Sequence, residues 1–144
     1  MDESDRQRWF RMVLLLGAAY FVFGVAFAAF ASWSASNSLR VTWNRLGFLT
    51  SAVAFAIHIG YEHFRLRNAP VITASHSSIA VALGAFALAV SANVHGYRVG
   101  SGNKGLLAFA LVAWPAITAV PAFVVALVAA AGLGLLGNRK GNEE

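Results

Sequence analysis

An uninterrupted apolar run from Met12 to Ala31 constrains this chain more than any other feature. Its twenty residues include no charged, amide, serine or threonine side chain. An α-helix rises about 1.5 Å per residue, so about twenty such residues cross the ~30 Å hydrocarbon core of a bilayer. A cleaved secretory signal is the competing interpretation, but its apolar region is usually only about 7–15 residues long. The run therefore predicts a membrane-spanning helix.

Three more apolar stretches follow, and the four predicted spans cover approximately residues 10–33, 43–64, 71–97 and 105–137. Only 12% of the residues are charged, compared with about 25% in soluble domains. The spans leave no length for a separate soluble domain, so residues 1–144 are expected to form one membrane domain. Because short turns join consecutive spans, the sequence predicts an all-α integral membrane protein, an antiparallel four-transmembrane-helix bundle.

The second span is the weakest of the four. Its uncharged stretch, from Leu46 to Tyr61, has sixteen residues, which cover only about 24 Å. We expect Arg45 to reach one headgroup layer and Glu62 to approach the other, with the helix continuing to Phe64 to supply the missing length.

The fourth span contains two prolines, Pro115 and Pro121. A proline within a helix removes one backbone hydrogen bond and frees the carbonyl four residues earlier, here those of Leu111 and Ile117. The pattern predicts a kinked helix or two helical pieces. The freed carbonyls either line an ion or substrate path or accept a hydrogen bond from a neighbouring hydroxyl such as that of Thr118.

Basic residues flank the apolar runs, and their distribution predicts the orientation of the chain. The net charge of +5 and the pI near 10.5 do not indicate nucleic-acid binding, because these residues do not gather on one polar face. With both termini cytoplasmic, seven basic residues lie inside, against four outside. The inside set is Arg6, Arg8, Arg11, Arg65, Arg67, Arg139 and Lys140, and the outside set is Arg40, Arg45, Arg98 and Lys104.

Small residues recur at helical spacing in the spans, and such residues let membrane helices approach each other closely. They predict the helix-packing positions of the bundle, although a small-residue groove could also form an oligomer face or a substrate path. The predicted positions are Gly17 and Gly24 in the first span and Ser77, Ala80, Gly84, Ala87 and Ser91 in the third.

The most polar stripe in any span contains His58, Glu62 and Arg65. His58 and Glu62 are four residues apart, so they share one helix face and the carboxylate can orient the imidazole. The alternative is an interfacial role, in which Glu62 bonds to Arg65 or Arg67 among the lipid headgroups.

All four histidines lie on the second and third spans. His76 is expected at nearly the same depth as His58 and His63, and two imidazoles facing each other across a helix pair can ligate a b-type haem. Interfacial histidines bonded to neighbours or headgroups are the alternative. The chain has no cysteine, and no third ligand for zinc or copper is evident, so no metal site is predicted.

The sequence offers little for catalysis. Five of its six acidic residues lie in the terminal tails, and only Glu62 lies in the body of the chain. No phosphate-binding loop, zinc-protease motif or nucleophile elbow is present. An enzyme is therefore disfavoured.

We expect a non-enzymatic accessory, assembly or self-associating subunit of the plasma or inner membrane. Its expected partners are the lipid bilayer and either further copies of itself or a larger membrane complex. Two alternatives stay open. One is a small transporter or channel subunit that uses the His58/Glu62 stripe and the kinked fourth span, and the other is a b-type haem electron carrier.

Overall fold

The structure is a computed structural model that describes residues 3–100 and 103–140. This part of the chain contains four α-helices and no strand: α1 (Glu3–Trp33), α2 (Asn37–Phe64), α3 (Pro70–Arg98) and α4 (Lys104–Lys140). The all-helical prediction is confirmed. Residues 101 and 102, in the predicted turn between the third and fourth spans, lie outside the described residues.

Local sequence signals explain where three of the helices begin. The Ser36 hydroxyl accepts a hydrogen bond from the Leu39 N–H at 3.3 Å and caps α2. Pro70 occupies the first turn of α3, where its missing N–H has no helical partner to lose. Asn103 Oδ1 accepts from the Gly105 N–H at 2.9 Å, at the start of α4.

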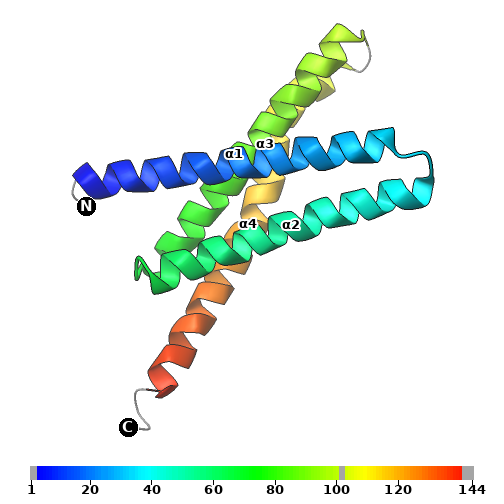
Figure 1. The fold of residues 1–144 in the computed structure, drawn as a ribbon. Helices are drawn as coiled ribbons and strands as arrows, with labels where there is room; N and C mark the ends of the chain where they lie inside the picture. Colours follow the sequence, from blue (N-terminus) through cyan, green and yellow to red (C-terminus); the bar gives the residue numbers. More distant parts are fainter. Residues whose placement is uncertain (1–2, 101–102, 141–144) are drawn as a thin grey trace.

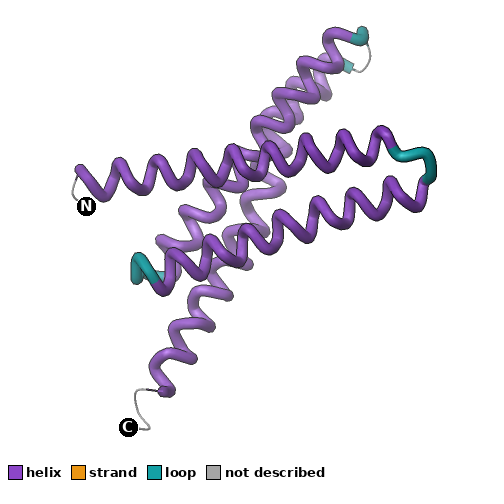
Figure 2. Tube along the Cα trace, viewed as in Figure 1, coloured by secondary structure: helices purple, strands orange, loops and turns teal. Residues whose placement is uncertain are grey.

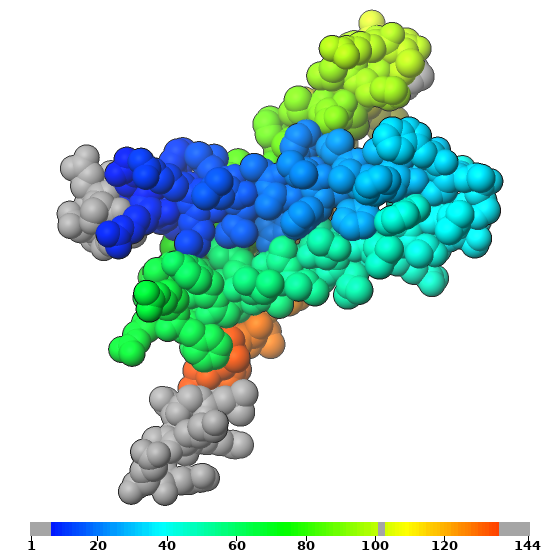
Figure 3. All heavy atoms as spheres, in the orientation of Figure 1, coloured from blue at the N-terminus to red at the C-terminus, as the bar shows by residue number. Residues whose placement is uncertain are grey.

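The helices form two antiparallel hairpins, α1–α2 and α3–α4, that cross each other (Figures 1 and 2). α3 lies at the centre of the arrangement and packs against all three other helices, whereas α1 and α4 make no contact with each other over the described residues. Figure 3 shows α1 and α2 side by side along their length, with the second hairpin passing behind them. The predicted bundle thus takes the form of two crossed hairpins.

Three of the helices are long and apolar enough to span a membrane: Gln7–Trp33, Pro70–Arg98 and Lys104–Leu135. α2 does not belong to this set, in keeping with its short uncharged stretch. Glu62 and two histidines in its last turns, His58 and His63, lower its mean hydropathy. α2 is therefore the weakest of the four helices as a membrane span.

α1 and α3 pack closely through glycine. A Cβ added to Gly84 would lie 2.7 Å from the Tyr20 Cβ and 3.1 Å from the Gly17 carbonyl oxygen, and one added to Gly17 would lie 2.9 Å from the Leu83 Cβ. At Gly24 the close neighbour is the Leu88 side chain. Only glycine fits such an approach without a shift of the neighbouring helix.

The other predicted packing positions on α3 differ in burial. Ser77 and Ala80 are buried, Ala87 is half-buried and Ser91 is exposed, so the tight contact does not extend to Ser91. Near this end of α3 the buried polar residue is Asn93. Its amide donates to the Ala89 carbonyl at 2.9 Å and to the Leu107 carbonyl of α4 at 2.8 Å.

α4 continues as one helix through Pro115 and Pro121, so it is not divided into two pieces. The Thr118 hydroxyl donates to the Trp114 carbonyl at 2.9 Å and to the Pro115 carbonyl at 3.0 Å. The proposed acceptors, Leu111 and Ile117, are not its partners. The hydroxyl instead bonds back to the preceding turn, as serine and threonine commonly do within helices.

Candidate functional site

The candidate site lies where the end of α2 meets α1 and the first turns of α3. The chain leaves α2 through a tight turn in which Arg67 adopts the left-handed conformation, with φ of 52°. This conformation is unfavourable for any residue except glycine. It brings Asn68 back over the end of α2, where its backbone N–H donates to the Glu62 carbonyl at 3.2 Å.

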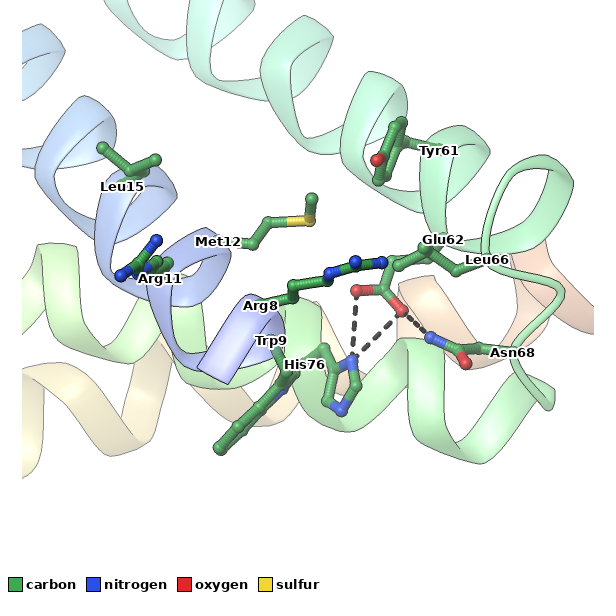
Figure 4. Close-up of a pocket in the computed structure, with 10 residues that line it drawn as sticks. All are labelled: Arg8, Trp9, Arg11, Met12, Leu15, Tyr61, Glu62, Leu66, Asn68 and His76. Atoms are coloured by element: carbon green, nitrogen blue, oxygen red, sulfur yellow. Dashed lines mark hydrogen bonds and ion pairs between the residues drawn. The ribbon is translucent and has the colours of Figure 1, made fainter. Parts of the chain in front are cut away.

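Glu62 is the centre of the site, and only 1% of its surface is exposed. The Asn68 side-chain amide donates to Oε2. His76 Nδ1, on α3, lies 3.1 Å from both carboxylate oxygens, and His58 Nε2, one turn earlier on α2, lies 3.6 Å from Oε1. Figure 4 shows Asn68 and His76 converging on the carboxylate. Together, His58, Glu62, Asn68 and His76 form what we call the Glu62 cluster.

Burial makes this arrangement chemically consequential. A carboxylate can only accept hydrogen bonds when ionised, so its contact with the His76 ring nitrogen requires a proton between the two atoms, whichever group carries it. An isolated charge is costly in an apolar interior, and two nearby imidazoles and an amide reduce that cost. The Glu62 cluster is thus built to hold a charge or a proton.

Several polar atoms around the cluster lack a hydrogen-bond partner over the described residues. Both ring nitrogens of His58 are buried and lack such a partner. The same holds for the hydroxyls of Thr73 and Ser77, which lie close to His76 in the sequence of α3. Buried polar groups are normally paired with protein or with water. These atoms therefore mark the interior beside Glu62 as a place suited to bound water.

An open pocket of about 530 Å³ adjoins the cluster. On its α1 side the Trp9 ring lies 5.2 Å from the His76 ring, centroid to centroid. The guanidinium of Arg8 extends across the pocket toward α2 (Figure 4). The lining residues are Arg8, Trp9, Arg11, Met12, Leu15, Tyr61, Glu62, Leu66, Asn68 and His76.

The predicted polar stripe is thus only partly assembled. His58 and Glu62 lie together, but Arg65 caps the end of α2 and is exposed. Within the described residues Glu62 forms no ion pair with Arg65 or Arg67, and its interfacial placement stays a prediction. The partners come from α2, the turn and α3 instead.

Two of the three candidate haem ligands lie beside Glu62, and the third, His63, contacts Phe64. His58 and His76 both lie beside the Glu62 carboxylate, with Nε2 of His58 at 3.6 Å and Nδ1 of His76 at 3.1 Å from Oε1. His63 stacks edge-on against Phe64, with ring centroids 4.9 Å apart. Among the side chains that the structure describes, those of residues 7–100 and 103–135, no group of three histidine or carboxylate side chains is placed to hold a metal ion.

Sequence reasoning missed Asn68, Trp9, Arg8 and Arg11 as members of this region. The equal-depth argument placed His76 beside the end of α2, but it could not identify Glu62 as its partner. Asn68 could have been noticed as a residue that often ends helices and occupies turns. No family model matches the chain, and neither a curated protein nor a solved structure shows significant similarity to it.

Proposed function

We propose that the chain is an integral membrane protein in which α2 is embedded together with the three apolar helices. The N-terminal end of α1, the α2–α3 turn and the C-terminal end of α4 lie on one side of the crossed hairpins (Figure 1). The excess of basic residues in these segments favours placing that side, with both termini, in the cytoplasm.

We further propose that the protein acts as a small transporter or channel subunit whose Glu62 cluster binds a proton. One observation carries this proposal: a carboxylate with 1% exposure lies between two imidazoles beside an open pocket. Ionisable side chains are costly within a membrane protein and commonly mark ion or proton pathways. Imidazole is the side chain whose ordinary titration falls near neutral pH.

The surroundings of the cluster support a path for the proton. The pocket gives access from the α1 side, and His76 and Glu62 lie at its wall. His58 precedes Glu62 by one turn on α2. The hydroxyls of Thr73 and Ser77, which have no partner among the described residues, lie on α3 within one turn of His76. Water bound among these atoms would connect them by hydrogen bonds. The role of Pro115 and Pro121 as a gate in α4 stays a prediction.

Proton movement in liposomes tests this function. The purified protein is reconstituted into vesicles with an imposed pH gradient, and the decay of the gradient is followed with an entrapped pH-sensitive dye. We expect the wild-type protein to accelerate the decay, and the Glu62→Gln and His76→Gln variants to lose that acceleration. His95→Gln is the matched control, because His95 is an exposed histidine at the other end of α3.

The proposal fails if vesicles with wild-type protein and vesicles with Glu62→Gln dissipate the gradient at equal rates. It also fails if His95→Gln loses as much activity as His76→Gln, because the effect would then not belong to the cluster. Circular dichroism of each reconstituted variant establishes that its helices are intact.

The second candidate is an accessory or self-associating subunit, and the outer face of α2 favours it. Val53 is 51% exposed and Ile57, four residues later on the same face, is 66% exposed, on a helix that is not apolar enough to rank as a membrane span. Because α2 is a short span, a partner helix would cover these exposed side chains more completely than the surrounding lipid would. The mass of the protein in micelles tests this candidate, since a stable monomer that copurifies with no partner would contradict it.

The haem alternative is tested by an absorption spectrum of the gently solubilised protein before and after reduction. Haem bound through His76 would give a Soret peak and sharp reduced bands, and a flat visible spectrum after expression with adequate haem would contradict this alternative.

A further inference from the structure

The pocket beside the Glu62 cluster combines charges of both signs with an apolar wall. Arg8 and Arg11 from α1 line it together with the buried Glu62 carboxylate of α2. Met12, Leu15 and Leu66 supply apolar surface to the same pocket. A ligand that fits this lining carries an anionic group, a cationic group and a hydrocarbon part.

The position of the pocket along the helices narrows the ligand further. The apolar run of α1 begins at Met12, directly after Arg11, so Arg8 and Arg11 lie at the membrane boundary. Leu66 and Asn68 belong to the α2–α3 turn at the same end of the molecule. The pocket therefore lies at the depth of the lipid headgroups, where snorkelling arginines and tryptophan are commonly found.

The carboxylate retains capacity for another hydrogen bond. Its two oxygens offer about four acceptor sites. Asn68 uses Oε2, and His76 lies between Oε2 and Oε1. His58 Nε2, at 3.6 Å from Oε1, is beyond hydrogen-bond distance, which leaves Oε1 able to accept from one more donor. An ammonium group entering the pocket would supply that donor, while a guanidinium binds phosphate well.

We propose that this pocket binds the headgroup of an aminophospholipid such as phosphatidylethanolamine. Arg8 and Arg11 contact the phosphate, and Glu62 accepts a hydrogen bond from the ammonium. The acyl chains leave along Leu15, which is 71% exposed on the outer face of α1. This site does not depend on proton transport, because lipid binding requires only the charges and the shape of the pocket.

Native mass spectrometry of the protein released from micelles tests the site. The protein is mixed in turn with phosphatidylethanolamine, phosphatidylglycerol and phosphatidylcholine, and the fraction that keeps one lipid is compared. We expect phosphatidylethanolamine to be retained about tenfold better than phosphatidylglycerol, the difference that one charge-assisted hydrogen bond makes. Phosphatidylcholine, whose ammonium has no N–H, should be retained less well than phosphatidylethanolamine.

Two sets of variants locate the binding. Glu62→Gln should remove the preference for phosphatidylethanolamine over phosphatidylglycerol, and the pair Arg8→Gln with Arg11→Gln should weaken retention of both lipids. Both arginines are exposed, so this pair tests the site even where a Glu62 variant folds poorly. Arg45→Gln is the matched control, because Arg45 is an exposed arginine at the other end of α2, and it should leave retention unchanged.

Free phosphoethanolamine provides the comparison with a soluble source of the same headgroup. We expect it to displace the lipid only at high concentration, because it lacks the acyl chains. Equal retention of the three lipids by the wild-type protein would overturn the proposal. Displacement of the lipid by low concentrations of phosphoethanolamine, or unchanged retention in the arginine pair, would overturn it as well.

Discussion

Two contacts made by α3 follow different physical rules. Near its middle, α3 meets α1 through Gly84 and Gly17, where the backbones of the two helices approach each other closely. Near its start, α3 meets α2 through His76 and Glu62, a buried polar pair supported by Asn68. The first contact depends on the absence of side-chain atoms, and the second depends on particular ones.

The difference separates what holds the helices together from what the protein can do. Shape alone stabilises the glycine contact, so even a methyl group added there should cost stability. The Glu62 cluster would be more costly than an apolar contact of equal volume, because charges are desolvated in it. A costly arrangement at one end of otherwise apolar helices favours a functional role for that end.

The largest effect should come from Glu62→Leu. We expect the free energy of unfolding to fall by about 3 kcal/mol, because His76 and Asn68 would lose their buried acceptor. Reversible denaturation in detergent micelles, followed by circular dichroism, measures this change. Glu62→Gln keeps one oxygen acceptor and should lose less, and a Leu variant as stable as wild type would show that the cluster contributes nothing to folding.

Gly84→Ala should have the next largest effect. The added Cβ would lie 2.7 Å from the Tyr20 Cβ, so α1 must shift, and we expect a loss of about 2 kcal/mol in the same denaturation experiment. Gly60→Ala is the matched control, because nothing lies within 4 Å of a Cβ at Gly60. It should be neutral or slightly stabilising, and equal losses in the two variants would argue against the close α1–α3 contact.

Asn93→Leu should be milder. The variant loses the hydrogen bond to the Leu107 carbonyl that joins α3 to α4, and we expect a loss of about 1 kcal/mol. Ser91→Ala, at an exposed position two residues earlier, should change stability much less. If the two substitutions have the same effect, the hydrogen bond between the helices contributes little.

The smallest effect should be a gain. Arg67→Gly relieves the left-handed conformation at φ of 52°, and we expect stabilisation of about 0.5 kcal/mol after the added flexibility of glycine is offset. Arg65→Gly is the control, since Arg65 has an ordinary φ of −92° and gains nothing from glycine. Stabilisation by both substitutions, or by neither, would contradict the role given to this turn.

The glycine contact could be predicted from the sequence, because small residues recur at helical spacing in each span and favour close packing. Gly17 and Gly24 are seven residues apart in the first span, and Ala80 and Gly84 are four apart in the third. The all-helical fold followed from the apolar runs in the same way. The Glu62 cluster was predicted only in part. Helix periodicity placed His58 beside Glu62, but the remaining partners depend on the geometry of the turn.

The geometry of the turn between α2 and α3 leaves no periodic pattern in the sequence. Arg67 must adopt an unfavourable conformation before Asn68 can reach Glu62, and no composition rule indicates arginine for such a position. Spacing also favoured Arg65 as a partner of Glu62, since charge suggests the pair, yet the chain leaves the helix at that residue. The crossing of the two hairpins was likewise beyond local patterns, because it depends on contacts between distant segments.

A double-mutant cycle on Glu62 and His76 tests the central claim most directly, since the proposed chemistry requires these two side chains to interact. The free energies of unfolding of Glu62→Gln, His76→Gln and the double variant are compared with that of the wild type. We predict that the two single losses together exceed the loss in the double variant, with a coupling free energy of about 1–3 kcal/mol. Losses that add to within about 0.3 kcal/mol would show that the two side chains do not interact, and would contradict the account.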